Sequence, residues 1–326
     1  MSIRRRRVNL ISAVNTTHAP ESIDFDAGKA AFLRYCRIRN LTDNTLAFYS
    51  DTLRELVRLL NEQNITKPLD VRRDHVMTAI ELKRKQKIKR GKLDTPSDHT
   101  INKLLRGWRA FFNFLYDEGF IADNPFDDIK QIKSKHSVIQ TFSREQINRL
   151  LAAPNRQTFT GYRDYLLMLL LYDTGIRISE AAGIQIPDIA WKERQIKVFG
   201  KGRKERLVPF SKTLARHLRE YIAIRGVLDH DYLFVNIDNK PFRTRGMQQA
   251  IRDYGIAAGI KGVRCSPHTF RHTFAKNWIM NGGDAFSLQK ILGHTSLEIV
   301  RVYVNLFSVD VLEKHDRYSP LERLDE

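Results

Sequence analysis

Cysteine and long hydrophobic runs are scarce in this sequence, and each scarcity narrows what the protein can be. Only two of the 326 residues are cysteine, Cys36 and Cys265. They fall in different predicted domains, so we expect packing residues and no disulfide. The longest apolar stretch, Leu166 to Tyr172, is far shorter than the roughly 18 residues that indicate a membrane span. The residues after the basic start are too polar for a secretory signal, so we expect a cytoplasmic protein.

Acidic residues are also in deficit, and this deficit points to a partner. The chain has 55 Lys and Arg against 37 Asp and Glu, a net charge of +18. Residues 1–140 carry 26 basic and 17 acidic residues, and residues 141–326 carry 29 and 20. Because both parts share the excess equally, a polyanion that touches both is favoured over a single basic tail. Nucleic acid is the expected partner, and a basic protein without such a partner is the alternative.

The length of 326 residues suits two domains rather than one core. The fold class that we expect is mainly α, with a helical N-terminal domain and a mostly helical C-terminal domain that holds a small antiparallel sheet. We expect a flexible basic arm at residues 1–22 and a four-helix domain at 23–128. A linker at 129–141 leads to a second domain at 142–306, and a tail follows at 307–326.

Apolar residues at helical spacing predict four helices in the first domain. They cover about 25–36, 43–60, 71–82 and 98–116. In the second domain, Ser143 with Gln146 predicts a helix start, and Gly175 ends an apolar helix over 164–174. Residues 195–199 and 206–210 predict two strands joined by a turn, with a third short strand at 233–235. Further helices are predicted at about 212–225, 245–258, 267–281, 285–292 and 296–306.

Two arginines and two histidines of the second domain could bind a phosphate. In-line attack on a phosphodiester builds negative charge on its non-bridging oxygens, and a planar guanidinium can hold two of them while staying charged. Arg177 in TGIRISE and Arg271 in SPHTFRHTFA are the candidate clamp. His268, three residues before Arg271, and His294 in ILGHTS could complete a cage of donors.

A lysine and a tyrosine could supply the remaining chemistry. Lys201 lies between two glycines in FGKGRKER, where a tight turn would leave its ammonium mobile enough to protonate a leaving 5′ oxygen. The phenol of Tyr303, in RVYVNL, has an ordinary pKa near 10. Neighbouring cations would favour its phenolate, which is a competent nucleophile.

Each of these residues has a simpler interpretation when taken alone. Arg177 and Glu180 could be a surface pair, the Lys201 hairpin could be merely solvated, and Tyr303 could be a core aromatic residue. His268 and His272 have the spacing of a helical zinc pair with Cys265 close by, but no further ligand cluster follows, so we expect no metal and no cofactor. The whole set in order within residues 177–303 favours catalysis.

These motifs resemble the tyrosine recombinases, the phage-integrase family, and the chain looks like an Xer-like or transposon-type member. TGIRISE resembles the first arginine box, FGKGRKER the lysine hairpin, SPHTFRHTFA the His-x-x-Arg box and LGHTS the later histidine box. The resemblance makes Tyr303 the nucleophile, gives catalytic roles to the other five residues and makes Glu180 a support for Arg177. These five catalytic residues are Arg177, Lys201, His268, Arg271 and His294.

The resemblance also implies a reaction and an assembly. Tyr303 would form a 3′-phosphotyrosyl bond, and four protomers would exchange strands of two double-stranded DNA sites through a Holliday junction, without metal or ATP. The product would be integration or excision of a mobile element, or resolution of replicons. The first domain would be a SAM-like core-binding domain, the apolar tail at 307–326 would dock on a neighbouring protomer, and an accessory DNA-bending or directionality protein is possible. Such a protein would be associated with the nucleoid.

Basic side chains on two predicted helices are the expected DNA contacts. Three lie on the fourth helix and two precede a helix of the second domain: Lys103, Arg106, Arg109, Arg243 and Arg245. The basic run at 83–92 could contact phosphate or form a solvated loop. The competing functions are a type IB topoisomerase, a non-catalytic DNA-binding regulator and a metal-dependent nuclease. The Xer-like boxes argue against a topoisomerase, and the presence of all six candidate catalytic residues argues against a regulator. The lack of a carboxylate cluster argues against a metal-dependent nuclease.

Overall fold

The computed structural model describes residues 23–86, 95–133, 139–200, 205–293 and 300–304. They fall into two compact units, divided between residues 136 and 137, each with a hydrophobic core of its own. The predicted linker at 129–141 spans this division. The predicted bounds of the arm, the two domains and the tail stay predictions. Within the described ranges, no helix is both long and apolar enough to cross a membrane.

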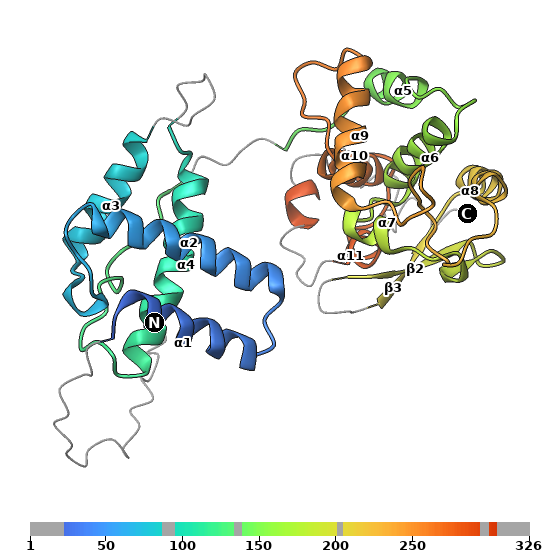
Figure 1. The fold of residues 1–326 in the computed structure, drawn as a ribbon. Coiled ribbons are helices and arrows are strands. Elements are labelled where there is room, and N and C mark those ends of the chain that lie inside the picture. The colour runs from blue at the N-terminus through green and yellow to red at the C-terminus, as the bar shows by residue number, and fades with distance from the viewer. Residues whose placement is uncertain (1–22, 87–94, 134–138, 201–204, 294–299, 305–326) are drawn as a thin grey trace, which may run out of the picture. The chain divides into compact units, whose positions relative to one another are not determined.

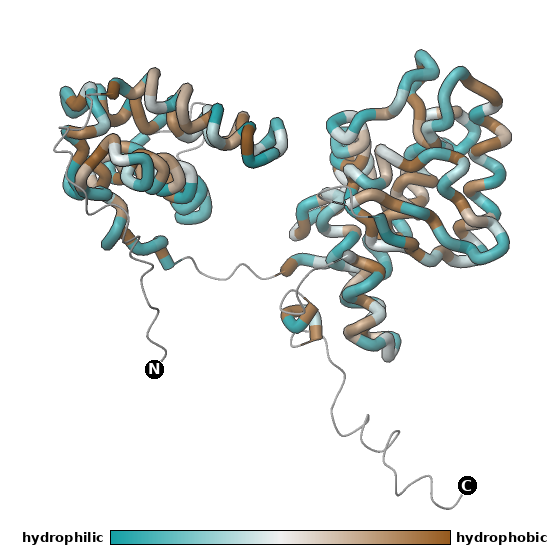
Figure 2. Tube along the Cα trace, turned by 90° about the horizontal axis from the view of Figure 1, so that it is seen from below, coloured by the Kyte–Doolittle hydropathy of each residue, from teal (hydrophilic) through white to brown (hydrophobic). Residues whose placement is uncertain are grey.

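Four helices form the first unit, as the sequence predicts (Figure 1). Asp24, Thr42 and Ser97 cap three of the helices by accepting hydrogen bonds from backbone N–H groups of the first turn. Along the helices, hydrophobic and hydrophilic residues alternate in short blocks, which is the pattern of amphipathic helices (Figure 2). The helices are α1 (Phe25–Ile38), α2 (Asp43–Asn61), α3 (Arg73–Lys85) and α4 (Asp98–Asp117), with a short 3₁₀ turn at Pro68–Asp70.

Helices α2 and α4 approach each other closely at one small residue. A Cβ atom added to Gly107 would lie 2.3 Å from Oγ1 of Thr52, so only glycine fits there. One residue on, the fully buried indole of Trp108 donates its N–H to the carbonyl of Thr52 at 2.8 Å. This hydrogen bond satisfies the one polar atom of a large core residue and fixes the register of the two helices.

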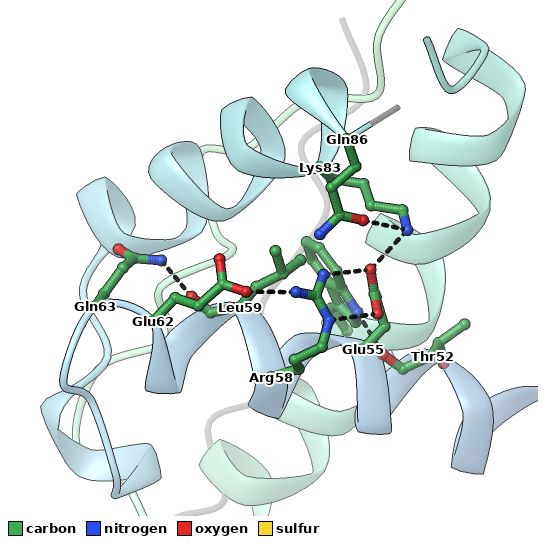
Figure 3. A network of polar contacts seen from close by, with 9 residues as sticks. Thr52, Glu55, Arg58, Leu59, Glu62, Gln63, Lys83 and Gln86 are labelled. Carbon is green, nitrogen blue, oxygen red and sulfur yellow. Dashed lines mark hydrogen bonds and ion pairs between the residues drawn. The ribbon is translucent and has the colours of Figure 1, made fainter. Parts of the chain in front are cut away.

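A polar network ties α3 to α2 beside this core (Figure 3). Glu55 accepts hydrogen bonds from Arg58, one turn along α2, and from Nζ of Lys83 on α3 at 2.6 Å. The hydrogen bonds from Arg58 are the main reason why the pKa of Glu55 is lowered. Lys83 and Arg84 open the basic run at 83–92, and Arg84 pairs with Asp98 at 2.8 Å. Two cations of that run are therefore already paired with acids, and residues 87–92 lie outside the described residues.

The second unit is a mostly helical domain with a small sheet, again as predicted. Helix α6 is its centre: it packs against α8, α9 and α10, and most of its side chains are buried. The helix begins at Phe159, earlier than the predicted 164, because the hydroxyl of Thr158 accepts the N–H of Gly161 at 3.1 Å. Helix α6 ends at Thr174, and a 3₁₀ turn lies at Ile186–Asp188. The described part of this unit has six further α-helices: α5 (Arg144–Ala152), α7 (Ile178–Gly183), α8 (Lys212–Arg225), α9 (Thr244–Ala257), α10 (Pro267–Met280) and α11 (Ala285–Leu292).

The sheet has three antiparallel strands in the order β1-β2-β3, but its third strand is not the predicted one. Strands β2 (Gln195–Phe199) and β3 (Glu205–Pro209) form the predicted hairpin, with Ile196 opposite Val208. The third strand is the two-residue β1 (Ile189–Ala190), whereas 233–235 makes only an isolated bridge from Val235 to Pro241. The prediction at 233–235 was wrong because this buried run makes only isolated backbone hydrogen bonds: Leu233 donates to the carbonyl of Ile184, and the carbonyl of Phe234 accepts from Phe242.

Candidate active site

Arg177 stands at the start of α7, directly after the turn that ends α6. Its backbone N–H donates to Oε2 of Glu180 at 2.7 Å, and its Nη1 donates to Oε1 at 3.0 Å. The Glu180 side chain is only 1% exposed, while that of Arg177 is 36% exposed. Glu180 therefore orients a half-exposed arginine from a buried position, which is the arrangement that the sequence motif predicts for this pair.

Arg206 on β3 is the site residue that the sequence analysis missed. Its Nη1 and Nη2 donate to Oε1 and Oε2 of Glu180 at 2.7 and 2.9 Å. Burial alone would raise the pKa of Glu180, but the hydrogen bonds from Arg206 and Arg177 outweigh it, and the net pKa is lowered. One signal could have found this residue: Arg206 and Val208 share a strand face by the period of two, and Val208 points into the core.

The end of α11 gathers three arginines. Gly293 ends this helix in the left-handed conformation, φ 64°, so its last carbonyls lack helical partners. The carbonyl of Ile291 accepts Nε of Arg206 at 2.8 Å. The carbonyl of Leu292 accepts from Arg177 at 3.4 Å and from Arg271 at 2.8 Å. Cations complement the negative end of the helix dipole, so the same contacts both cap α11 and bring the two clamp arginines together.

Arg271 lies on α10 and is 5% exposed. Besides Leu292, it donates to the carbonyl of Gly175 at 2.8 Å, which joins α10 to the end of α6. Burial, followed by the charge of Arg177, lowers the pKa of its guanidinium to about 10. The group stays cationic at neutral pH, so two like charges are held together where an anion would relieve their repulsion.

His268 lies in the first turn of α10 and lines a cavity of about 680 Å³. Partial burial, with the charges of Arg271, Arg264 and Arg177, lowers the pKa of the His268 ring. Arg252, Arg264 and His272 line the same cavity. Within the described ranges, no three histidine, cysteine or acidic side chains converge. A zinc pair at His268 and His272 would therefore lack a third protein ligand among these residues.

Tyr303 is buried, with 2% of its surface exposed, in a helical stretch at 300–304. Its ring packs with Val300, Leu288 and Ile279 in a small hydrophobic cluster. Its hydroxyl makes a 2.6 Å hydrogen bond with Nδ1 of His272. Burial raises the pKa of the phenol more than the charge of Arg271 lowers it, so the expectation that neighbouring cations make it a phenolate is wrong for this state.

Two predicted site residues, Lys201 and His294, lie outside the described residues. The segments that lead to them are placed: β2 and β3 flank 201–204, and α11 with Gly293 precedes 294. Strand β3 packs against α11, so the hairpin belongs to the same part of the unit as Arg177 and Arg271.

The five side chains predicted to contact DNA differ in exposure: four are exposed and Arg109 is half-buried. Lys103 and Arg106 are exposed on α4, and each lies about 5.5 Å from the ring centre of Phe48. Arg109 is half-buried and donates to the carbonyl of Ile129 within its own unit. In the second unit, Arg243 and Arg245 are exposed at the start of α9.

Comparison with known proteins places this site in a family. The model of the phage integrase family matches residues 140–308, more than half of the chain. The tyrosine recombinase XerC of Thermodesulfovibrio yellowstonii is 34% identical over 249 residues, covering 74% of this chain and 81% of the relative. XerC of Chlamydia muridarum is 30% identical over 305 residues, covering 89% and 96%.

Solved structures share the fold at low sequence identity. A lambda integrase dimer bound to a COC′ core site is 17% identical and superposes with a TM-score of 0.71, covering 90% of this chain and 82% of that one. XerH recombinase bound to a palindromic difH substrate is 18% identical, with a TM-score of 0.68 and coverage of 91% and 85%. The matched family model, the relatives and the order of the motifs agree, and the chain belongs to the phage integrase family of tyrosine recombinases.

Proposed function

We propose that the protein cuts and rejoins double-stranded DNA at paired recombination sites, with Tyr303 as the nucleophile. The observation that carries the proposal is the meeting of Arg177 and Arg271 on the Leu292 carbonyl. Tyr303 is near this pair: burial raises the pKa of its phenol, and the charge of Arg271 offsets part of that rise. Two arginines held together beside a tyrosine suit a phosphodiester, because they stabilise the charge that builds on it during attack.

The side chains divide the reaction between them. Arg177 and Arg271 bind the non-bridging oxygens, with His268 and His294 as further donors. Nε and Nη2 of Arg177 make no hydrogen bond within the described residues, so they are available to a phosphate. Oη of Tyr303 forms a bond to phosphorus as the bond to the 5′ oxygen breaks, and Lys201 gives that oxygen a proton. The freed 5′ hydroxyl then attacks the phosphotyrosyl bond of the partner duplex, so bond energy is conserved without ATP.

Strand exchange needs an assembly of protomers. We propose a homotetramer on two DNA sites, linked by the tail at 307–326 and passing through a Holliday junction, with an accessory DNA-bending protein setting direction where one is used. The tail lies outside the described residues, and the apolar residues Phe307, Val309, Val311 and Leu312 at its start support this role. Deleting 307–326 should abolish paired-site complexes on native gels and leave single-site binding, whereas unchanged pairing would contradict the docking role.

A plasmid assay tests the function. DNA segments that the protein binds, taken from the flanks of its own gene, are placed in pairs on a supercoiled plasmid. Wild type should delete or invert the segment between the sites, and Tyr303→Phe should not. Relaxation of a plasmid with one site, without any exchange between two, would instead indicate a topoisomerase. Tight binding with neither activity would indicate a regulator, and both outcomes would overturn the proposal.

A further inference from the structure

The hydroxyl of Tyr303 contacts a histidine outside the set of six predicted catalytic residues. Nδ1 of His272 lies 2.6 Å from Oη of Tyr303, and the two ring centres are 5.8 Å apart. This distance is short for a hydrogen bond between a hydroxyl and a nitrogen. The nucleophile is therefore in direct contact with a titratable side chain.

The helix geometry explains why His272 reaches the tyrosine. His268 and His272 are four residues apart on α10, so they lie on one face, and both line the 680 Å³ cavity. Arg271 points elsewhere, to the carbonyls that end α6 and α11. Thr273, which follows His272, is buried, and its hydroxyl accepts a hydrogen bond from the backbone N–H of Phe142. Successive residues of this turn thus serve the tyrosine and the structural core separately.

We propose that His272 is the general base of DNA cleavage, taking the hydroxyl proton of Tyr303 on Nδ1 as Oη attacks the scissile phosphate. This inference rests on the proposed function. The proton passes from Oη to Nδ1, the new bond joins Oη to phosphorus, and the broken bond leaves the 5′ oxygen to be protonated by the general acid. In rejoining, His272 returns the proton to Oη.

The surroundings of the pair keep the ring ready to accept a proton. Burial, followed by the neighbouring His268 and Arg271, lowers the pKa of His272, so the ring is neutral at neutral pH. Among the described residues, the ionisable groups around the pair come from several elements. Those at the cavity or near His268 are Arg177, Arg252, Arg264, His268 and Arg271. Helix α10 also has Lys276, one turn after His272, α6 has Tyr172 and Asp173, and Arg301 lies two residues before Tyr303. Helix α11, which also packs against α10, has Lys290 as its one ionisable residue, and it is exposed.

DNA binding would strengthen this base. The charge of Arg271 acts on the His272 ring, so a phosphate bound by Arg271 brings negative charge near that ring. A nearby anion favours the protonated form of a histidine. The proton affinity of His272 therefore rises when the substrate arrives.

The rival interpretation is that His272 only holds Tyr303 in place, and His272→Asn separates the two. The amide of asparagine can keep a hydrogen bond to Oη, but it cannot take a proton at any ordinary pH. The assay measures the rate of the covalent adduct on a nicked DNA substrate between pH 6 and 9. Thermal unfolding and DNA binding are measured on the same samples, and His230→Gln, a histidine away from the cavity, is the matched control.

General-base catalysis predicts a specific pattern. At neutral pH, His272→Asn should form the adduct about 10²–10⁴-fold more slowly than wild type, while His230→Gln is unchanged. The wild-type rate should rise with pH as His272 loses its proton and then level off. The rate of His272→Asn should keep rising, because solvent must then remove the proton. Added imidazole should restore part of the rate of His272→Gly.

Two results would overturn the inference. The first is His272→Asn at the wild-type rate across the pH range. The second is an equal loss at every pH with no effect of imidazole on His272→Gly, as expected of a residue that only positions the tyrosine. Both differ from failure of the proposed function, in which wild type itself forms no adduct that depends on Tyr303.

Discussion

Arg206 holds Glu180 by two parallel hydrogen bonds of 2.7 and 2.9 Å, although the two residues lie 26 positions apart. The pair joins β3 to α7, and Arg206 also binds the carbonyl of Ile291 at the end of α11. One buried carboxylate thus fixes both the proposed phosphate ligand Arg177 and the strand that follows Lys201. The hairpin and the arginine clamp are coupled through Glu180.

Removal of Arg206 should destabilise the second unit. Arg206→Ala leaves Glu180 buried with half its partners, and breaking a buried pair in this way typically costs about 3–5 kcal/mol. Denaturant unfolding followed by far-UV circular dichroism measures the change. The matched control is Arg216→Ala, whose pair with Glu220 is exposed and spans 3.9 Å. Equal effects of the two substitutions would contradict the role given to Arg206.

The carboxylate of Glu180 should also make the free energy of unfolding depend on pH. The pKa of Glu180 is held below its ordinary value of 4.5, so the folded state favours the charged form. Its stabilising contribution is complete above the pKa of the unfolded chain and is lost as pH falls through the lower folded pKa. The free energy of unfolding should therefore drop with acidification below about pH 4.5 in wild type and drop less in Glu180→Gln. Identical profiles would contradict this.

Arg177 should matter for cleavage more than for folding. Its side chain is half-exposed, whereas Arg271 is buried and bridges α6, α10 and α11. Arg177→Gln should slow adduct formation by about 10²–10³-fold, the usual loss of one preorganised donor. Arg271→Gln should slow adduct formation and lower the melting temperature as well. If Arg177→Gln cleaves DNA at the wild-type rate, Arg177 is not one of the phosphate-binding arginines.

Salt dependence of binding tests the predicted DNA contacts. Lys103→Gln and Arg106→Gln should each reduce the slope of log K against log salt by about 1, because each phosphate contact releases counterions. Arg54→Gln, an exposed arginine of the same unit, is the control. Arg109→Gln should lower the melting temperature in addition, because Arg109 binds the carbonyl of Ile129. Slopes that do not change would place the DNA surface elsewhere.

The general-acid role of Lys201 has a chemical test. Lys201→Ala should slow cleavage of ordinary DNA by about 10²–10⁴-fold, the usual contribution of a positioned acid. A substrate with sulfur at the 5′ bridging position needs no acid, because a thiolate leaves unprotonated. Lys201→Ala and wild type should cleave that substrate at similar rates. A defect that persists on the sulfur substrate would mean that Lys201 acts otherwise.

Helical periodicity and turn residues were enough to predict most of the fold. Caps such as Thr42 and Ser143 and breakers such as Gly175 have local causes, so the helices and the hairpin follow from short stretches of sequence. The two-residue β1 escaped prediction because so short a strand has no pattern of its own. The run at 233–235 looks like a strand because buried segments of either kind are uniformly apolar.

The site was predictable where its motifs are local and was missed where contacts are distant. Arg177 and Glu180 are three residues apart, so their pairing follows from helix geometry. Arg206 reaches Glu180 only because the β2–β3 hairpin packs against α7 and α11. His272 reaches Tyr303 only through the placement of 300–304. The pKa of Tyr303 was misjudged because sequence shows the nearby cations but not the burial that outweighs them.

The most direct test of the central claim is to identify the residue that becomes bound to DNA. The protein is incubated in EDTA with a nicked fragment that it binds, and the denaturation-resistant adduct is digested and sequenced by mass spectrometry. Our account predicts a nucleotide attached through its 3′ phosphate to Tyr303, and no adduct from Tyr303→Phe. Attachment to another residue, or an adduct that forms only with a divalent metal, would contradict it.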